Sequence, residues 1–261
     1  MRVSVIITTY NRPDALLLVL QSIESQTKLP EEVIIADDGS DDNTEKLITN
    51  YQESSSLNII HSWQGDKGFR LAKSRNKAIA RSNFEYIVLV DGDVILHHKF
   101  IQDHLDHAES GYFIQGTRVL LTQKRTQQAL NNSTGNFSFL SRGIRNRKNA
   151  IHSNYFSKLL SKKKNHIQGI KTCNMSFYKE DCLNINGFNN DFEGWGREDS
   201  EFAVRLLNSG INRKNVRFNM IQFHLWHKEA TRDSLVQNDA NLHSAIDNHV
   251  NWCDNGISKY L

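Results

Sequence analysis

The sequence predicts an α/β fold in which helices cover both faces of a mostly parallel central sheet. Strand-like and helix-like segments alternate over roughly the first 110 residues, and this alternation is typical of parallel strands joined by crossover helices. Three of these strand-like segments also end in polar clusters, at residues 8–11, 37–40 and 91–93. Ligands of such sheets bind beyond the carboxyl ends of the strands, so we expect these clusters to line one crevice.

The pattern of apolar residues predicts the elements in order. β-Branched and apolar runs predict strands at residues 3–8, 32–36, 57–61 and 86–90. Helical spacing predicts helices at 12–26, 42–51 and 68–82, the first opened by Pro13. The later chain predicts a basic helix at 151–160, strands at 169–178 and 220–226, a loop at 186–196, and a helix at 200–208 stopped by Gly210.

The charge distribution divides the chain. Net charge is +3, yet the segment from Ser110 to Lys179 holds thirteen Lys or Arg and no Asp or Glu. This asymmetry indicates an anionic partner for a basic insertion at about 117–168. Three interpretations stay open: a solvated insertion, contact with an anionic membrane surface, and nucleic-acid binding. The last is disfavoured because aromatic residues do not alternate with the basic ones, so no nucleic-acid partner is expected.

We predict two halves and a tail for the 261 residues: 1–110, 111–230, and a helical C-terminal segment at 231–261. The chain enters a strand-like run at once, without the features of a signal peptide. No run approaches the ~20 apolar residues that span a bilayer. Its three cysteines are sparse, as in reduced cytosolic proteins. The expected location is the cytoplasm, with peripheral attachment at the inner face of the cell membrane left open.

Asp91-Gly92-Asp93 follows the last of the N-terminal strand-like runs. Alternate residues of an extended chain point to the same side, so the two carboxylates can face one ligand. The glycine between them leaves room for a ligand near the backbone. The pair is therefore suited to hold a divalent cation against a phosphate, although Asp and Gly also form ordinary solvated turns.

Several motifs occur in an order that carries a family resemblance. Residues 3–12 (VSVIITTYNR), 36–42 (ADDGSDD), Arg75-Asn76 and Asp91-Gly92-Asp93 together resemble the family 2 glycosyltransferases. The resemblance implies the GT-A fold, a Rossmann-like sheet with a smaller acceptor-binding part. Residues 194–199 (GWGRED) resemble the acceptor motif of β-1,4-galactosyltransferases and of bacterial chondroitin-polymerase-type enzymes, and residues 64–70 and 224–227 point to the same subgroup.

The resemblance implies a UDP-sugar donor and names the residues that would bind it: Thr8, Tyr10, Arg12, Asp38, Arg75, Asp91 and Gly92. Asp38 would accept a hydrogen bond from the uracil ring, and an ionised acceptor strengthens such a bond. Asp91 would reach the ribose hydroxyls. The alternatives are a structural turn at Asp38, core packing for Tyr10, and a solvated helix face for Arg75.

The same resemblance implies a bound Mn²⁺ or Mg²⁺. Asp93 would bind the cation directly, Asp91 would contact it through water, and His224 would be the third ligand, with His227 as its rival. Carboxylate and phosphate oxygens are hard ligands that suit both cations, and an imidazole among them favours Mn²⁺. A histidine on a strand is also frequently structural, so the choice between the two histidines stays open.

Catalysis would depend on the second block. Asp199 is the candidate general base, because inverting transfer needs a carboxylate to take the proton of the acceptor hydroxyl. Glu198 would bind acceptor hydroxyls, and Trp195 with Gly196 would contact the acceptor sugar. The structural alternatives are a helix cap for Asp199 and core packing for Trp195.

The predicted function is inverting, metal-dependent transfer of a hexose or N-acetylhexosamine (Gal, GalNAc, Glc or GlcNAc). The acceptor would be a saccharide or lipid-linked saccharide of a bacterial surface polysaccharide, such as O-antigen, capsule or lipooligosaccharide. A sugar nucleotidyltransferase is the first alternative, but it would need a glycine-rich basic loop where Thr8–Asn11 stands. A non-catalytic carbohydrate-binding module is the second, and it would not need Asp91, Asp93 and Asp199 together.

Overall fold

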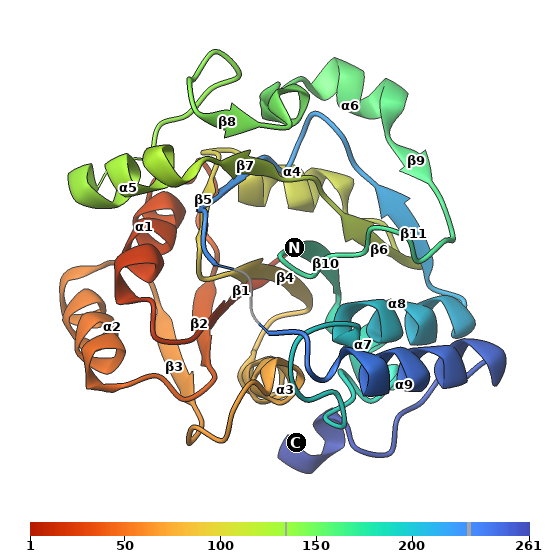
Figure 1. Cartoon of the computed structure of the whole chain (residues 1–261). Helices are drawn as coiled ribbons and strands as arrows, with labels where there is room; N and C mark the ends of the chain where they lie inside the picture. The colour runs from red at the N-terminus through yellow and green to blue at the C-terminus, as the bar shows by residue number, and fades with distance from the viewer. Residues whose placement is uncertain (134, 229–230) are drawn as a thin grey trace.

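A computed structural model describes residues 1–133, 135–228 and 231–261 (Figure 1). Residue 134 of the predicted basic insertion and residues 229–230, next to the predicted tail, lie outside this description. The central sheet has the strand order β3-β2-β1-β4-β10-β6-β11-β9. Its strands are β1 (Val3–Thr9), β2 (Glu32–Asp37), β3 (Ile59–Trp63), β4 (Tyr86–Asp91), β6 (Tyr112–Gln115), β9 (Lys162–Lys163), β10 (Asn174–Tyr178) and β11 (Asn212–Asn215).

The sheet is mostly parallel, as predicted. Strands β1 to β4 run parallel to one another. Strand β10 is antiparallel to both β4 and β6, so β6 runs in the same direction as β4, and β11 is parallel to β6. The carboxyl ends of β1, β2, β4, β6 and β11 therefore meet at one edge of the sheet, together with the start of β10.

Helices cover both faces of this sheet. They are α1 (Pro13–Glu24), α2 (Asp42–Ser54), α3 (Leu71–Arg81), α4 (Phe100–His107), α7 (Lys179–Asn184) and α8 (Glu198–Asn208). Val5 and Ile7 of β1 pack with α1 and α4, whereas Ile6 packs with α3 and α8 on the other face. A parallel strand that is buried on both faces has a continuous apolar sequence. This is why the apolar run at residues 3–8 correctly predicted β1.

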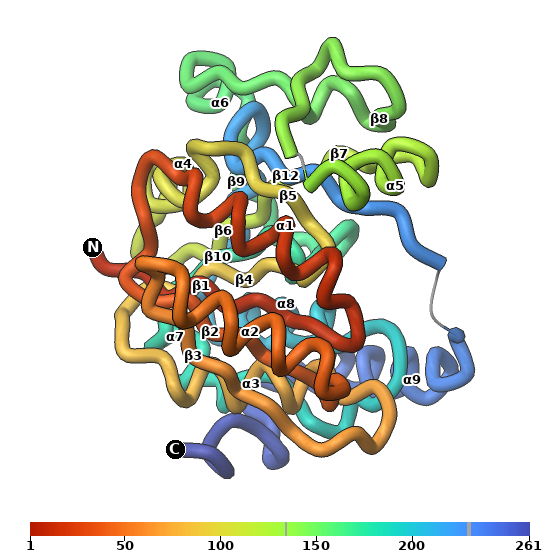
Figure 2. The backbone as a smooth tube through the Cα atoms, turned by 90° about the vertical axis from the view of Figure 1, so that its left-hand side faces the viewer, coloured from red at the N-terminus to blue at the C-terminus, as the bar shows by residue number. Residues whose placement is uncertain are grey.

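A smaller sheet of order β5-β12-β7-β8 packs beside α1. It comprises β5 (Val94–Leu96), β7 (Val119–Leu121), β8 (Ile144–Arg145) and β12 (Gln222–His224). The basic segment adds α5 (Gln123–Asn132), a 3₁₀ turn (Arg147–Ala150) and α6 (Asn154–Leu160). Figure 2 shows this segment at one end of the molecule, opposite α3 and the C-terminal turn Ile257–Tyr260. Helix α9 (Leu235–Asp247) packs against α8.

Some predicted bounds were wrong. The strand expected at 169–178 begins only at Asn174, and the helix expected at 151–160 begins at Asn154. Short elements that the sequence analysis did not assign, among them β6, β7, β11 and α5, fill the middle of the chain. No helix within the described ranges combines the length and apolarity that crossing a bilayer requires.

Candidate active site

Asp91 and Gly92 lie against the end of β1. The Thr8 hydroxyl donates a hydrogen bond to Asp91 Oδ1 (3.1 Å), and the Gly92 amide donates to the Thr8 carbonyl oxygen (2.6 Å). A Cβ on Gly92 would lie 2.6 Å from that same oxygen. The position that a Cβ would take at Gly92 is therefore occupied by the protein's own backbone, so close packing against β1 requires a glycine here.

Asp93 meets two histidines. Pairing of β12 with β5 aligns His224 with Val94, and the Leu225 amide donates to the Asp93 carbonyl oxygen (2.9 Å). His224 Nε2 lies 3.5 Å from Asp93 Oδ1, and His227 Nε2 lies 3.3 Å from Asp93 Oδ2. The two histidines treated as rivals thus both face the carboxylate.

This group fits a divalent cation. One ligand atom from each of Asp93, His224 and His227 lies within 4.8 Å of the others. Asp93 Oδ1 is buried and has no hydrogen-bond partner among the described residues. Burial raises the pKa of Asp93, against the opposing effect of His224, so a cation here would offset the cost of the buried charge. Asp91, expected as a further ligand, lies outside the group.

A second group of possible metal ligands differs because its carboxylate already has hydrogen-bond partners. His97, Asp103 and His152 also lie close together. However, Asp103 already accepts hydrogen bonds from His152 Nε2 (3.0 Å), Asn219 Nδ2 (3.1 Å) and the Met220 amide (2.9 Å). A carboxylate whose oxygens are satisfied in this way has a structural role, so we do not treat this group as a metal site.

Arg75 connects the two halves of the site. It is 2% exposed. Its Nη2 lies 3.6 Å from Asp91 Oδ1, and its Nη1 lies 3.3 Å from Glu198 Oε1. The guanidinium carbon stands 5.3 Å from the centre of the Phe188 ring. The solvated-helix alternative for Arg75 is therefore wrong.

Glu198 and Asp199 open helix α8. Arg197 precedes them in a left-handed conformation (φ 77°), and a helix N-terminus favours nearby negative charge. Burial, and then the charge of Glu198, raises the pKa of Asp199 to about 7, while Arg75 opposes the shift. A carboxylate with a pKa near the working pH is suited to general-base catalysis.

The loop that carries Trp195 is held from both sides. The Gly194 amide donates to the Phe69 carbonyl oxygen (2.8 Å). Asn238 Nδ2, on α9, donates to the carbonyl oxygens of Glu193 (3.1 Å) and Gly196 (2.9 Å). Trp195 itself is 40% exposed, which rules out core packing. Sequence reasoning missed Asn238, because nothing in the polar C-terminal segment marks it.

Asp38, which we expected at the uracil base, directly follows β2. Asp38 is 4% exposed, and its carboxylate accepts from Gln64 Nε2 (2.6 Å) and the Arg70 amide (2.6 Å). The turn that follows β2 is held by Asp37, whose carboxylate accepts a hydrogen bond from the Ser40 amide (2.8 Å).

Tyr10 and Arg12 lie near the surface. Tyr10 is 47% exposed and donates to Asp66 Oδ2 (3.0 Å), so it is not a core residue. Arg12 Nε lies 3.4 Å from Asp14 Oδ1. Both side chains are accessible to solvent.

Comparison with known proteins agrees with this arrangement. Residues 4–183 match the model of glycosyl transferase family 2, and residues 155–228 match a model described as the N-terminal domain of galactosyltransferase. A chondroitin synthase of Escherichia coli is 25% identical over 82% of this chain and 33% of its own length. A hyaluronan synthase of Pasteurella multocida is 28% identical over 82% of the chain and 23% of its length. The chain thus spans a third or less of these two relatives.

The structure is similar to that of S. aureus TarS. The fragment 1–349 solved in complex with UDP superposes with a TM-score of 0.64 over 100% of this chain and 68% of that one, at 15% identity. Likeness at this identity shows the fold, which is GT-A as predicted. The matched family and these relatives are glycosyltransferases, which favours that class of enzyme over sugar nucleotidyltransferases and non-catalytic binding modules. The chain belongs to glycosyl transferase family 2.

Proposed function

We propose that the protein transfers a hexose or N-acetylhexosamine, with inversion, from a UDP-sugar to a hydroxyl of an acceptor saccharide. The observation that carries this proposal is the bridge from Asp91 through Arg75 to Glu198. It joins the strand end next to Asp93 to the helix that begins with Glu198 and Asp199. One site thereby combines a group suited to a cation with a carboxylate suited to accept a proton.

The donor would lie along the crevice from Asp38 to Asp93. Asp38 would face the uracil ring, Thr8, Tyr10 and Arg12 would flank the nucleoside, and Asp91 would accept from the ribose hydroxyls. Asp93, His224 and His227 would hold the cation; carboxylate oxygen with imidazole nitrogen favours Mn²⁺ over Mg²⁺. When bound, the cation supplies positive charge to the leaving diphosphate.

Asp199 would act on the acceptor. It takes the proton of the acceptor hydroxyl while that oxygen forms a bond to the anomeric carbon and the bond from that carbon to UDP breaks. Glu198, held by Arg75, would orient acceptor hydroxyls. Trp195 would pack on a sugar face beside Gly196, since an exposed aromatic ring on an anchored loop suits such a contact.

The relatives suggest a setting for this reaction. Two of them are named as synthases of chondroitin and hyaluronan, which supports a role in bacterial surface polysaccharide synthesis. Cys173, Cys182 and Cys253 are free and buried, as expected of a protein in the reducing cytoplasm. The acceptor would be a saccharide, free or lipid-linked.

Peripheral contact with an anionic membrane is a further part of the proposal. Helix α6 exposes Tyr155 (74%) and Leu159 (66%) next to the exposed Lys158, and apolar and basic groups together favour anionic lipid surfaces. Vesicles of phosphatidylglycerol should sediment the protein, and Tyr155→Ser with Leu159→Ser should reduce this. Val236→Ser, at an exposed apolar residue of α9, is the control; equal loss in the control would contradict the contact.

A panel of UDP-sugars tests the main proposal. Each sugar is offered with Mn²⁺, with Mg²⁺, and with chelator, and UDP release is measured with and without added saccharides. We expect release with one UDP-sugar that depends on the cation and is abolished in Asp93→Asn. Release that is equal in the presence of chelator, or equal in the variant, would contradict metal-dependent transfer.

A further inference from the structure

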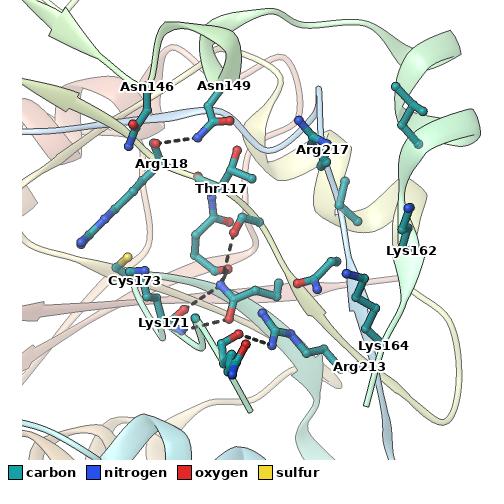
Figure 3. A pocket seen from close by; sticks show the side chains of 18 of the residues that line it. Thr117, Arg118, Asn146, Asn149, Lys162, Lys164, Lys171, Cys173, Arg213 and Arg217 are labelled. Carbon is teal, nitrogen blue, oxygen red and sulfur yellow. Dashed lines mark hydrogen bonds between the residues drawn. The ribbon is translucent and has the colours of Figure 1, made fainter. Parts of the chain in front are cut away.

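A cavity lies beside the proposed active site and is lined largely by the basic segment. It has a volume of about 470 Å³. Figure 3 shows side chains from the ends of β6 and β11, the start of β10, and the segment around β9 gathered around it. Its basic lining residues are Arg118, Lys162, Lys164, Lys171, Arg213 and Arg217.

Among the described residues, no acidic side chain offsets the positive charge of this cavity. Among the described lining residues none is acidic, and no salt bridge within the described ranges involves any of the six cations. Lys163 provides the contrast, because it pairs with Glu109 at 2.7 Å and does not line the cavity. Alternate residues of an extended strand face the same way, so Lys162 and Lys164 line the cavity while Lys163 turns away from it.

Arg213 gives the cavity a fixed, buried cation. It is 3% exposed, and its Nη1 donates to the carbonyl oxygens of His166 (2.7 Å) and Gln168 (2.8 Å). Its Nε is buried and has no partner among the described residues. A buried guanidinium held in one orientation, with a donor left over, suits a carboxylate or phosphate group.

The cavity continues the edge of the sheet at which the proposed active site lies. Strand β10 pairs Asn174 with Val90, so the preceding Cys173, which lines the cavity, lies opposite Asp91. Gln222 Nε2 donates to Cys173 Sγ (3.3 Å), two residues before His224. From β4, strands β6 and β11 are the second and third neighbours. At ~4.8 Å per strand, β6 and β11 lie about 10–14 Å from β4 along this edge, a distance that a short saccharide spans.

We propose that this cavity binds an anionic group, a carboxylate or a phosphate, carried by the acceptor saccharide. The acceptor would lie along the edge of the sheet, with its reacting hydroxyl near Asp199 and its anionic group among Lys164, Lys171 and Arg213. This inference rests on the proposed glycosyl transfer and names the class of acceptor. It also gives a function to the basic segment that is separate from the exposed face of α6.

Binding of small anionic sugars tests this inference. The full chain, with UDP and Mn²⁺, is titrated with methyl glucuronide and with glucose 6-phosphate, and methyl glucoside serves as the neutral probe. The cavity variant is Lys164→Gln with Lys171→Gln. The matched control is Lys124→Gln with Lys148→Gln, two exposed lysines of the same basic segment that do not line the cavity.

At least one anionic probe should bind the unaltered chain better than the neutral sugar, and the cavity variant should bind that probe about tenfold more weakly. The control variant should bind as the unaltered chain does. Preference for one probe identifies the group as carboxylate or phosphate. Equal binding of anionic and neutral probes, or equal loss in the control, would overturn the inference.

Two further measurements distinguish this inference from the proposed glycosyl transfer and from the proposed membrane contact. UDP affinity with Mn²⁺ should be the same in the unaltered chain and in all variants, which also shows that the variants fold. If the unaltered chain itself did not bind UDP, that result would contradict the proposed function instead. Sedimentation with phosphatidylglycerol vesicles should not change in the cavity variant. If vesicle binding falls there and sugar binding does not, the cavity serves a membrane contact and the inference is wrong.

Discussion

Arg75 and Glu198 are 123 residues apart in the chain, yet Nη1 of the first lies 3.3 Å from Oε1 of the second. The same guanidinium also lies 3.6 Å from Asp91. A buried cation between two carboxylates relieves the repulsion that they would otherwise exert on each other. Arg75 therefore stabilises the approach of the two polar ends that form the proposed site.

Replacing this arginine should be costly. Arg75→Ala leaves Glu198 buried without its partner, and breaking a buried ion pair costs about 3–5 kcal/mol of the free energy of unfolding. Denaturant unfolding measures the loss. Lys73→Ala, on the same helix, should change the free energy of unfolding by no more than about 0.5 kcal/mol. Equal stability of the two variants would show that the bridge contributes nothing.

The cation group predicts a response to Mn²⁺ in the absence of any sugar. Asp93→Asn keeps the shape of the side chain and removes its charge. Loss of residues that only support a ligand lowers metal affinity about 10–100-fold, so loss of this ligand should lower it at least as much. Thermal shift on Mn²⁺ titration measures the change, with His243→Gln on α9 as the control. An unchanged shift in Asp93→Asn would place the cation elsewhere.

Asp199 predicts the pH dependence of transfer. Its pKa is raised to about 7, so the carboxylate is mostly protonated below that pH and cannot accept a proton. The ratio kcat/KM should therefore rise as the pH increases through about 7 and then level off. Asp199→Asn should retain UDP binding and lose about 10²-fold or more in rate. A near-native rate in this variant would assign the base to another group.

The same group predicts a change in stability. Its pKa is 3.8 in an unstructured peptide and about 7 in the folded chain, so the folded state binds the proton more tightly. Stability contributed by this group is present below pH 3.8 and is lost as the pH rises towards 7. Asp199→Asn should remove this decline, which unfolding curves at about pH 5 and about pH 8 would detect. An identical pH dependence in both proteins would contradict the shift.

Gly92 predicts a packing defect. Gly92→Ala would bring a methyl group to 2.6 Å from the Thr8 carbonyl oxygen, and relief of such overpacking typically costs about 1–3 kcal/mol. Gly65→Ala is the matched control, since its nearest contact would be Trp63 at 3.7 Å. Unfolding by urea compares the two, and a stable Gly92→Ala protein would show that β1 and β4 can separate at this point.

The sequence predicted the elements of residues 1–110 better than those that follow. Strands such as β1 and β4 are buried on both faces, so their apolar runs are continuous and easy to recognise. Strands β6 and β11 have only four residues each, and β11 is Asn-Arg-Lys-Asn. Pairing with β6 puts these polar residues in a strand, and that pairing depends on contacts between distant segments which no local pattern reveals.

In the candidate site, too, local motifs were predicted from the sequence and contacts between distant segments were not. Order along the chain was enough to single out Asp93 and Asp199, because each lies in a compact motif. It could not decide between His224 and His227, since that choice depends on how β12 pairs with β5. The order of motifs also could not reveal that Arg75 has two carboxylate partners, because Glu198 comes close to Arg75 only when α8 packs on the sheet. Gln64, which holds Asp38, lay in a motif already noted but had no assigned role.

Asn238 has a consequence for where this catalytic unit can be cut. The two matched family models end at residues 183 and 228, and a chain trimmed at residue 228 would keep every matched residue. It would lack the amide that holds the carbonyl groups of Glu193 and Gly196. The Trp195 loop would then lose its anchor on that side. A truncated chain that keeps the Trp195 loop anchored should therefore include α9, beyond the boundary that sequence similarity draws.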